Sequence, residues 1–161
     1  MTNKYPLLFT PYQLGKYTLQ SRIVVTGHAA NFVDHNQLPT EKYAYYLRER
    51  ARGGAGLVSI GETGVHPASD PTLPLNWDDS IIPRYRQIAD LVHEFPVPVI
   101  TQLSHGGRRA GVERRRYLKA DWPTIAPSPV PMSAYGYVQV MPSEMSTGEV
   151  EDMVQAFGLA A

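Results

Sequence analysis

Three short apolar segments, each followed at once by polar residues, constrain the fold of this chain more than any other feature. Residues 22–26, 57–60 and 97–103 are predicted strands, because each is a short apolar run bounded by turn-forming residues. Helical patterns separate them along the chain. The order strand, helix, strand, helix, strand, with strands apolar on both faces, is typical of a parallel α/β sheet.

The two intervening segments have apolar residues at helical spacing. Thr40 is the predicted N-cap of the first helix, which continues to about Arg52 and ends at the glycine pair 53–54. Asp79 or Ser80 is the predicted cap of the second, which has a proline in its first turn, where proline is tolerated. Its apolar positions are Ile81, Tyr85, Ile88 and Val92.

The sequence predicts three further features: a hairpin near the beginning, a long connection and a last helix. The alternation of polar and apolar residues around Gly15 and Lys16 predicts a hairpin. Ser146 and Glu149 form a predicted capping box for a last helix, in which the chain ends. A proline-rich connection from about 105 to 145 has a length typical of functional or disordered segments. The apolar face of the last helix is predicted to comprise Val150, Val154 and Phe157.

Two fold classes share this order of elements. A doubly wound sheet places a glycine-rich phosphate turn after its first strand, but residues 27–32 contain a single glycine. The glycines between 53 and 56 precede a strand, so they end a helix instead. A barrel places polar residues at the carboxyl end of every strand, and here these are Thr26, His28, Glu62, Thr63, Gln102 and His105. We therefore predict an α/β fold of the TIM (β/α)8 barrel class. The 161 residues would hold about three βα units and an entry hairpin, since a complete barrel needs about 250 residues.

Composition excludes several classes of site and partner. The chain has no cysteine, which excludes disulfides, thiolate metal sites and cysteine nucleophiles within it. Its 15 basic and 15 acidic residues balance, so no net charge would attract nucleic acid or an anionic membrane. Its beginning does not have the pattern of a signal peptide, and no run approaches the ~20 apolar residues of a membrane span. We expect a cytoplasmic protein with a small-molecule substrate.

Five segments together resemble a known family. In order, "LLFTPYQLGKYTLQSRIVVTGHAA", "GLVSIGETGVHP", "ITQLSHGGRRA", "APSPV" and "PSEMSTGEVEDMVQAF" are similar to the N-terminal half of Old Yellow Enzyme-type NADH:flavin oxidoreductases. The branch of 2,4-dienoyl-CoA reductase and trimethylamine dehydrogenase is nearest. The most specific element is Q-L-x-H-x-G-R at residues 102–108, and the resemblance extends from Leu7 to Phe157. Residues 1–161 would thus be the N-terminal part of an FMN-binding barrel domain whose later strands are absent.

The resemblance implies a cofactor, a reaction and a set of flavin contacts. The reaction would be reduction of an activated C=C bond in an enone or dienoyl-CoA-like substrate, or a related flavin reaction, with NADH or NADPH as electron donor. A homo-oligomer is compatible with it, and an iron–sulfur cluster would be confined to a region beyond these residues. Gln102 would bond the pyrimidine edge of the flavin, because one primary amide complements both an acceptor and an N–H donor. The other implied contacts are Thr26, Gly27, His28, Ala29 and the backbone at Glu62.

Two of these positions depart from the family pattern. Ala29 stands where many relatives place a cysteine or threonine that tunes the flavin, and alanine has no group for that role. Glu62 replaces a small or aromatic residue. The catalytic acid, the substrate-anchoring pair and the grip on the FMN phosphate are expected in later strands, so no catalytic residue is assigned within this chain.

Other interpretations remain open on the residues alone. His28, Glu62 and His105 come from three strand ends and would be the metal ligands of a barrel hydrolase. The chain could equally be an inert truncated fragment, since an isolated part of a barrel leaves strand edges unpaired. The arginines of the loop after His105 form a solvated face or hold a phosphorylated substrate or nicotinamide cofactor. They are Arg108, Arg109, Arg114, Arg115 and Arg116.

Overall fold

The computed structural model describes residues 4–28, 30–112, 124–134 and 138–161. The chain divides into two compact units, each formed from several segments of the sequence. The first unit contains Met1–Asp34, Leu38–Glu62 and Ser80–Gln102, and the second contains His35–Gln37, Thr63–Asp79 and Leu103–Ala161. Each unit is described by itself below.

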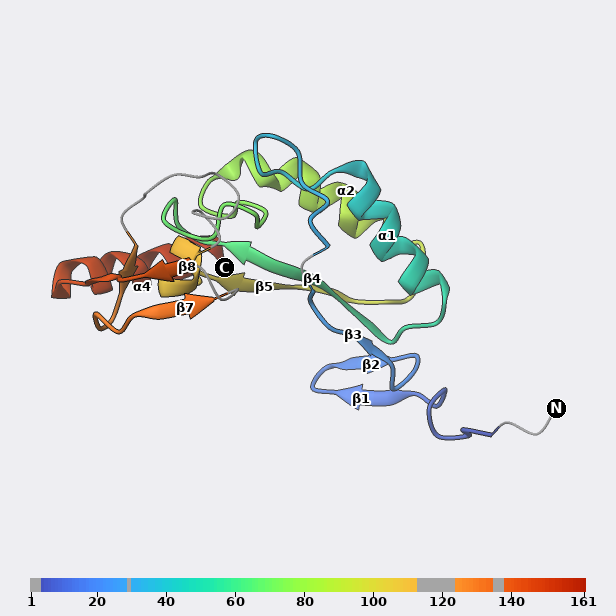
Figure 1. The fold of residues 1–161 in the computed structure, drawn as a ribbon. Coiled ribbons are helices and arrows are strands. Elements are labelled where there is room, and N and C mark those ends of the chain that lie inside the picture. The colour runs from blue at the N-terminus through green and yellow to red at the C-terminus, as the bar shows by residue number, and fades with distance from the viewer. Residues whose placement is uncertain (1–3, 29, 113–123, 135–137) are drawn as a thin grey trace. The chain divides into compact units, whose positions relative to one another are not determined.

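The first unit begins with the predicted hairpin (Figure 1). Strands β1 (Tyr12–Leu14) and β2 (Tyr17–Leu19) pair in antiparallel register, with Leu14 opposite Tyr17. The intervening turn uses Gly15 at a φ of +55°, a conformation in which glycine has no steric penalty. The prediction of a hairpin is confirmed.

Three further strands form a sheet in the order β3-β4-β5. β3 (Val24–Val25) pairs with β4 (Leu57–Gly64) in parallel. The arrows of β4 and β5 (Val99–Ser104) point the same way in Figure 1. β3 is shorter than the predicted strand and β4 extends four residues beyond its apolar run. Glu62 and Thr63 therefore lie inside a strand, contrary to the prediction that they follow one, because the central strand keeps backbone partners after its apolar residues end.

Two helices follow the sheet strands as predicted. α1 (Glu41–Arg52) ends at a glycine pair whose second member, Gly54, has a φ of +92°. Thr40 is its N-cap residue, but the hydroxyl donates to the carbonyl of Phe32 at 2.9 Å and makes no capping bond. α2 (Ile82–Val92) follows the 3-10 turn η1 (Asp79–Ile81) and has its proline in the first turn.

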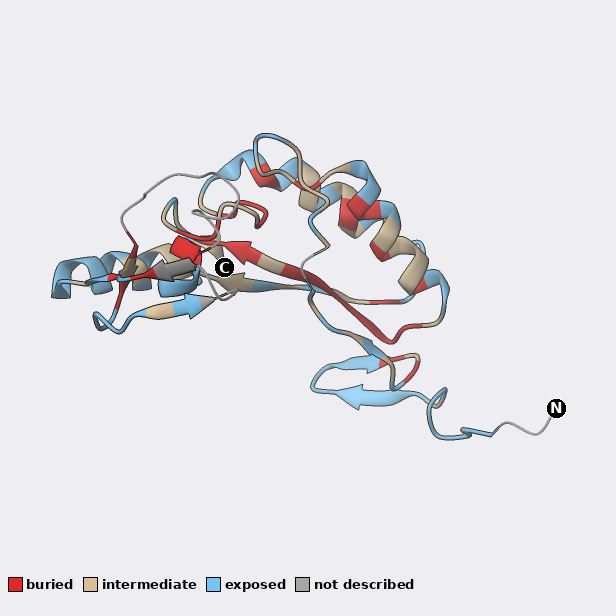
Figure 2. Cartoon of the chain, viewed as in Figure 1, coloured by how far each residue is buried: buried red, intermediate tan, exposed pale blue. Residues whose placement is uncertain are grey.

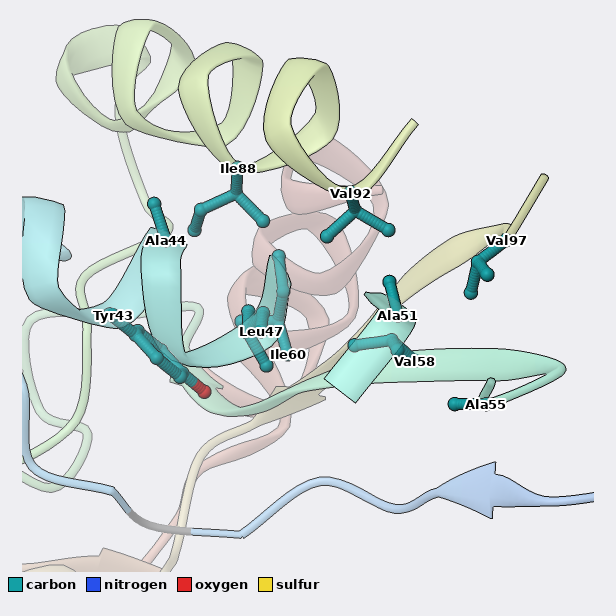
Figure 3. Packing of buried hydrophobic residues seen from close by; sticks show 10 residues of the cluster. All are labelled: Tyr43, Ala44, Leu47, Ala51, Ala55, Val58, Ile60, Ile88, Val92 and Val97. Carbon is teal, nitrogen blue, oxygen red and sulfur yellow. The ribbon is translucent and has the colours of Figure 1, made fainter. Parts of the chain in front are cut away.

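The core of the first unit lies between the two helices and β4. Leu47 of α1, Ile88 of α2 and Val58 of β4 are each at most 1% exposed, and their side chains converge in Figure 3. Figure 2 shows the same pattern as buried residues along β4 and along one side of each helix. This packing covers one face of the sheet with helices, as a βα-barrel unit requires. The other buried members are Tyr43, Ala44, Ala51, Ala55, Ile60, Val92 and Val97.

The second unit contains structure that the proline pattern did not predict. Residues 108–112 are helical, β6 (Ile125–Ala126) pairs with β9 (Ser143–Glu144) in parallel, and β7 (Met132–Ala134) pairs with β8 (Val138–Val140) in antiparallel register. β6 and β9 are distant in the sequence, so no local pattern predicts that they pair.

The last helix, α4 (Thr147–Ala160), has its predicted capping box. The N–H of Ser146 donates to the Glu149 carboxylate at 2.8 Å, and the N–H of Glu149 donates to the Ser146 hydroxyl at 3.3 Å. Two residues of its predicted apolar face, Val150 and Val154, are 43% and 67% exposed. Among the described residues, no helix is both long and apolar enough to cross a membrane.

Candidate functional site

Gln102, near the carboxyl end of β5, has its side chain on the face of the sheet that the helices leave uncovered. Thr101 of β5 lies 3.3 Å from the hydroxyl of Tyr85 on α2, so its side chain is directed toward that helix. Side chains alternate along a strand, and the next residue, Gln102, is exposed on the opposite face. Thr26 and His28, just after β3, are exposed as well. Glu62 is half-buried within β4.

Gly27 and Gln102, predicted as neighbours around one ligand, lie against each other. A Cβ atom added to Gly27 would come 3.0 Å from the Oε1 atom of Gln102 and 3.1 Å from the carbonyl oxygen of Ile60. A side chain at position 27 would therefore displace the amide of Gln102 or the backbone of β4. Glycine at position 27 therefore leaves room for the Gln102 amide next to the backbone of β4.

A second glycine, Gly61 of β4, lies between a tyrosine side chain and a backbone carbonyl group. Its backbone N–H donates a 2.7 Å hydrogen bond to the phenol oxygen of Tyr43, which is 3% exposed. A Cβ atom at position 61 would overlap the carbonyl group of His28. Burial raises the pKa of Tyr43 above its ordinary value, against the opposing effect of the Gly61 bond. Helix α1, β4 and the segment after β3 are thus joined at one point.

The imidazole of His28 is bound to α1. The Nε2 atom of His28 lies 2.6 Å from the hydroxyl oxygen of Tyr46, and the two rings meet edge to face at 5.4 Å. Tyr46 is not among the residues predicted from the sequence. The available signal was weak: Tyr43, Tyr46 and Arg50 recur at three- and four-residue spacing on α1 and therefore share a side of the helix.

Ala29 and His105 are the remaining predicted residues. Ala29 lies outside the described residues. His105 belongs to the second unit, where its Nδ1 atom accepts the N–H of Gly107 at 3.3 Å. No group of three or more histidine and carboxylate side chains could hold a metal ion in the part of the chain that the structure describes. The described residues therefore give no support to the alternative of a hydrolase metal site from His28, Glu62 and His105, which stays a prediction.

Arg108 and Arg109 are the arginines of the loop after His105 that lie among the described residues. Arg108 is exposed, and its guanidinium group donates weakly to the carbonyl oxygens of Val130 and Pro131 at 3.5 and 3.4 Å. Residues 114–116 lie outside the described residues. Binding of a phosphorylated substrate by this loop remains a prediction.

Known proteins resemble this chain in sequence. A probable N-methylproline demethylase of Rhizobium meliloti is 34% identical over 158 residues, which is 96% of this chain and 22% of that protein. A multifunctional alkene reductase/demethylase OYE of Caballeronia cordobensis is 29% identical, over 96% of this chain and 22% of that protein. An NADH oxidase of Thermoanaerobacter brockii is 28% identical, over 98% of this chain and 24% of that protein. The chain thus spans about a fifth to a quarter of the length of these relatives.

Solved structures share the fold. TcOYE with pHBA is 27% identical and superimposes with a TM-score of 0.79, over 97% of this chain and 47% of that chain. The Old Yellow Enzyme from a Pichia species superimposes with a TM-score of 0.83 at 22% identity, over 96% of this chain and 42% of that chain. These likenesses confirm the predicted fold class, the N-terminal part of a TIM barrel. The model of the NADH:flavin oxidoreductase / NADH oxidase family matches residues 7–161, and the chain belongs to this family.

Proposed function

We propose that the full-length protein containing this chain is an FMN-dependent oxidoreductase that takes electrons from NADH or NADPH. The observation that carries the proposal is the meeting of Gly27 and Gln102 at the strand ends, beside the exposed Thr26 and His28. Family membership supports it, because the matching family is one of flavin oxidoreductases.

The residues present fit a flavin. The ring system of a flavin is planar, and glycine at position 27 leaves room for the Gln102 amide beside the backbone of the strand ends. The Gln102 amide carries both a donor and an acceptor, as the pyrimidine edge of the ring requires. Thr26 and His28 add side chains that can bond the same ligand, and the backbone at Glu62 would close on it from β4. When bound, the flavin accepts a hydride and passes its electrons to a second substrate.

Two classes of substrate follow from different observations. The resemblance to C=C reductases, including an alkene reductase/demethylase, supports reduction of an enone or dienoyl-CoA-like compound. The two relatives at 34% identity are named a probable N-methylproline demethylase and an N,N-dimethylglycine/sarcosine dehydrogenase, which supports oxidation of an N-methylated amino acid. The half-buried carboxylate of Glu62 is compatible with a cationic amine nearby. We propose the reductase reaction first and the amine oxidation as the second candidate.

The test uses the purified full-length protein. We expect flavin absorbance as isolated or after reconstitution with FMN, and bleaching of that absorbance under anaerobic NADH or NADPH. An enone that restores the absorbance would support the reductase. Bleaching by N-methylproline or dimethylglycine without a nicotinamide would support the second candidate. A protein that takes up no FMN but holds stoichiometric zinc would overturn the proposal.

A further inference from the structure

The contact between His28 and Tyr46 constrains which nitrogen of the imidazole carries the proton. The Tyr46 hydroxyl lies 2.6 Å from Nε2, so one of the two groups donates to the other. A neutral imidazole nitrogen is a better acceptor than a phenol oxygen, and a phenol is a good donor. The favoured arrangement therefore has the Tyr46 hydroxyl donating to Nε2. In that arrangement the proton of the neutral ring is on Nδ1, which points away from Tyr46.

The ring of Tyr46 is held in place by its surroundings. The guanidinium group of Arg50 lies over its face at 3.3 Å from the ring centre, and the Arg50 side chain also donates to the Tyr46 carbonyl at 3.2 Å. Phe32 meets the ring at 5.6 Å in an edge-to-face arrangement, and Tyr43 lies at 6.2 Å. A cation over an aromatic face is attracted to it. These contacts fix the hydroxyl of Tyr46 in one direction, that of His28.

The carbonyl group of His28 is also restrained. It lies so close to Gly61 that a Cβ atom there would overlap it, and Gly61 is bonded to Tyr43. Both the backbone and the ring of His28 are therefore oriented by tyrosines of α1, one acting directly and one through β4. His28 is an exposed residue, and it directly follows Gly27, which lies against Gln102.

We propose that Tyr46 is a positioning residue that holds His28 in its Nδ1–H form, so that His28 donates a hydrogen bond to the bound cofactor. The part that concerns the cofactor rests on the proposed function, whereas the choice of tautomer does not. Without the Tyr46 hydroxyl, the ring would rotate and return to the Nε2–H form that a free imidazole prefers. The donor facing the ligand would then be lost.

The tautomer can be measured without any cofactor. In the full-length apoprotein at about pH 8.5, where histidines are neutral, ¹⁵N shifts distinguish a protonated ring nitrogen from an unprotonated one. We expect Nδ1–H for His28 in the wild type and a shift toward Nε2–H in Tyr46→Phe. Tyr45→Phe is the matched control, because Tyr45 is adjacent on α1 and 48% exposed. An Nε2–H signature in the wild type, or an unchanged signature in Tyr46→Phe, would overturn the proposal.

FMN titration followed by flavin fluorescence tests the part of the proposal that concerns the bound cofactor. Tyr46→Phe should weaken binding about three- to tenfold, the range expected for one neutral hydrogen bond, and Tyr45→Phe should not. The same Tyr46→Phe change made in a His28→Gln background should have no further effect, since the ring it positions is absent. An equal loss in both backgrounds would show a merely structural role and refute positioning. If the wild type binds no FMN, the proposed function fails, and the tautomer result is unaffected.

Discussion

The backbone N–H of Gly61 in β4 donates its hydrogen bond to the phenol oxygen of Tyr43 on α1, at 2.7 Å. Both residues are buried, and the bond joins a strand to the helix that precedes it in the chain. A backbone donor in the interior of a protein requires a partner, and here a side chain supplies it. The bond lies beside the carbonyl group of His28, so its loss should affect both stability and the candidate site.

Replacement of Tyr43 by phenylalanine should lower the free energy of unfolding of the full-length protein. The change removes the acceptor of a buried N–H, which costs about 1–3 kcal/mol. Urea denaturation followed by circular dichroism measures the difference. The exposed neighbour provides the control: Tyr45→Phe should change the free energy by less than about 0.5 kcal/mol. Equal effects of the two substitutions would show that the hydrogen bond between Gly61 and Tyr43 does not contribute measurably to the free energy of unfolding.

The same tyrosine should make stability depend on pH in the alkaline range. Burial raises the folded-state pKa of Tyr43 above its ordinary value of 10.0, so the unfolded chain releases this proton first. The contribution of Tyr43 is therefore fully present below pH 10 and is lost as the pH rises through the folded-state pKa. Between about pH 8 and pH 11 the wild type should lose more unfolding free energy than Tyr43→Phe. Parallel losses in both proteins would contradict this assignment.

Gly61→Ala adds only one methyl group but should disturb the segment after β3. The added methyl group would overlap the His28 carbonyl, and backbone on both sides has little freedom to move. We expect a loss of about 1–3 kcal/mol, the usual cost of overpacking, together with weaker FMN binding. Gly148→Ala in α4 meets no atom within 4 Å and should be neutral or slightly stabilising. Both variants can be compared by thermal unfolding and FMN titration.

Gln102→Leu should slow turnover more than it weakens FMN binding. A hydrogen bond to a charged group is worth about 1.5–3 kcal/mol, and a bond to the flavin edge should be stronger when the ring is reduced and negative. The reduction potential of the bound flavin should therefore fall, which spectroelectrochemical titration measures. Gln155→Leu, at an exposed position of α4, should leave it unchanged. A wild-type potential and wild-type rates in Gln102→Leu would mean that Gln102 is only structural.

Local sequence determined the elements that depend on neighbouring residues. The hairpin turn needs a residue that tolerates positive φ, and Gly15 supplies it. The start of α4 needs donors and acceptors three residues apart, as in Ser146 and Glu149. The end of α1 needs a glycine such as Gly54. The order of strands and helices, together with polar residues at strand ends, was also enough to choose a barrel over a doubly wound sheet.

Tertiary structure decided what depends on residues distant in the chain. β4 continues through Glu62, and β6 pairs with β9, because backbone groups far apart in sequence meet there. The hydroxyl of Thr40 bonds a carbonyl eight residues away and not the helix start. The positions of Tyr43 and Tyr46 predicted a helix face, but not that one phenol would bond β4 and the other His28. A side-chain hydroxyl bonds whichever polar group the packed backbone brings within about 3 Å, and only the fold determines that group.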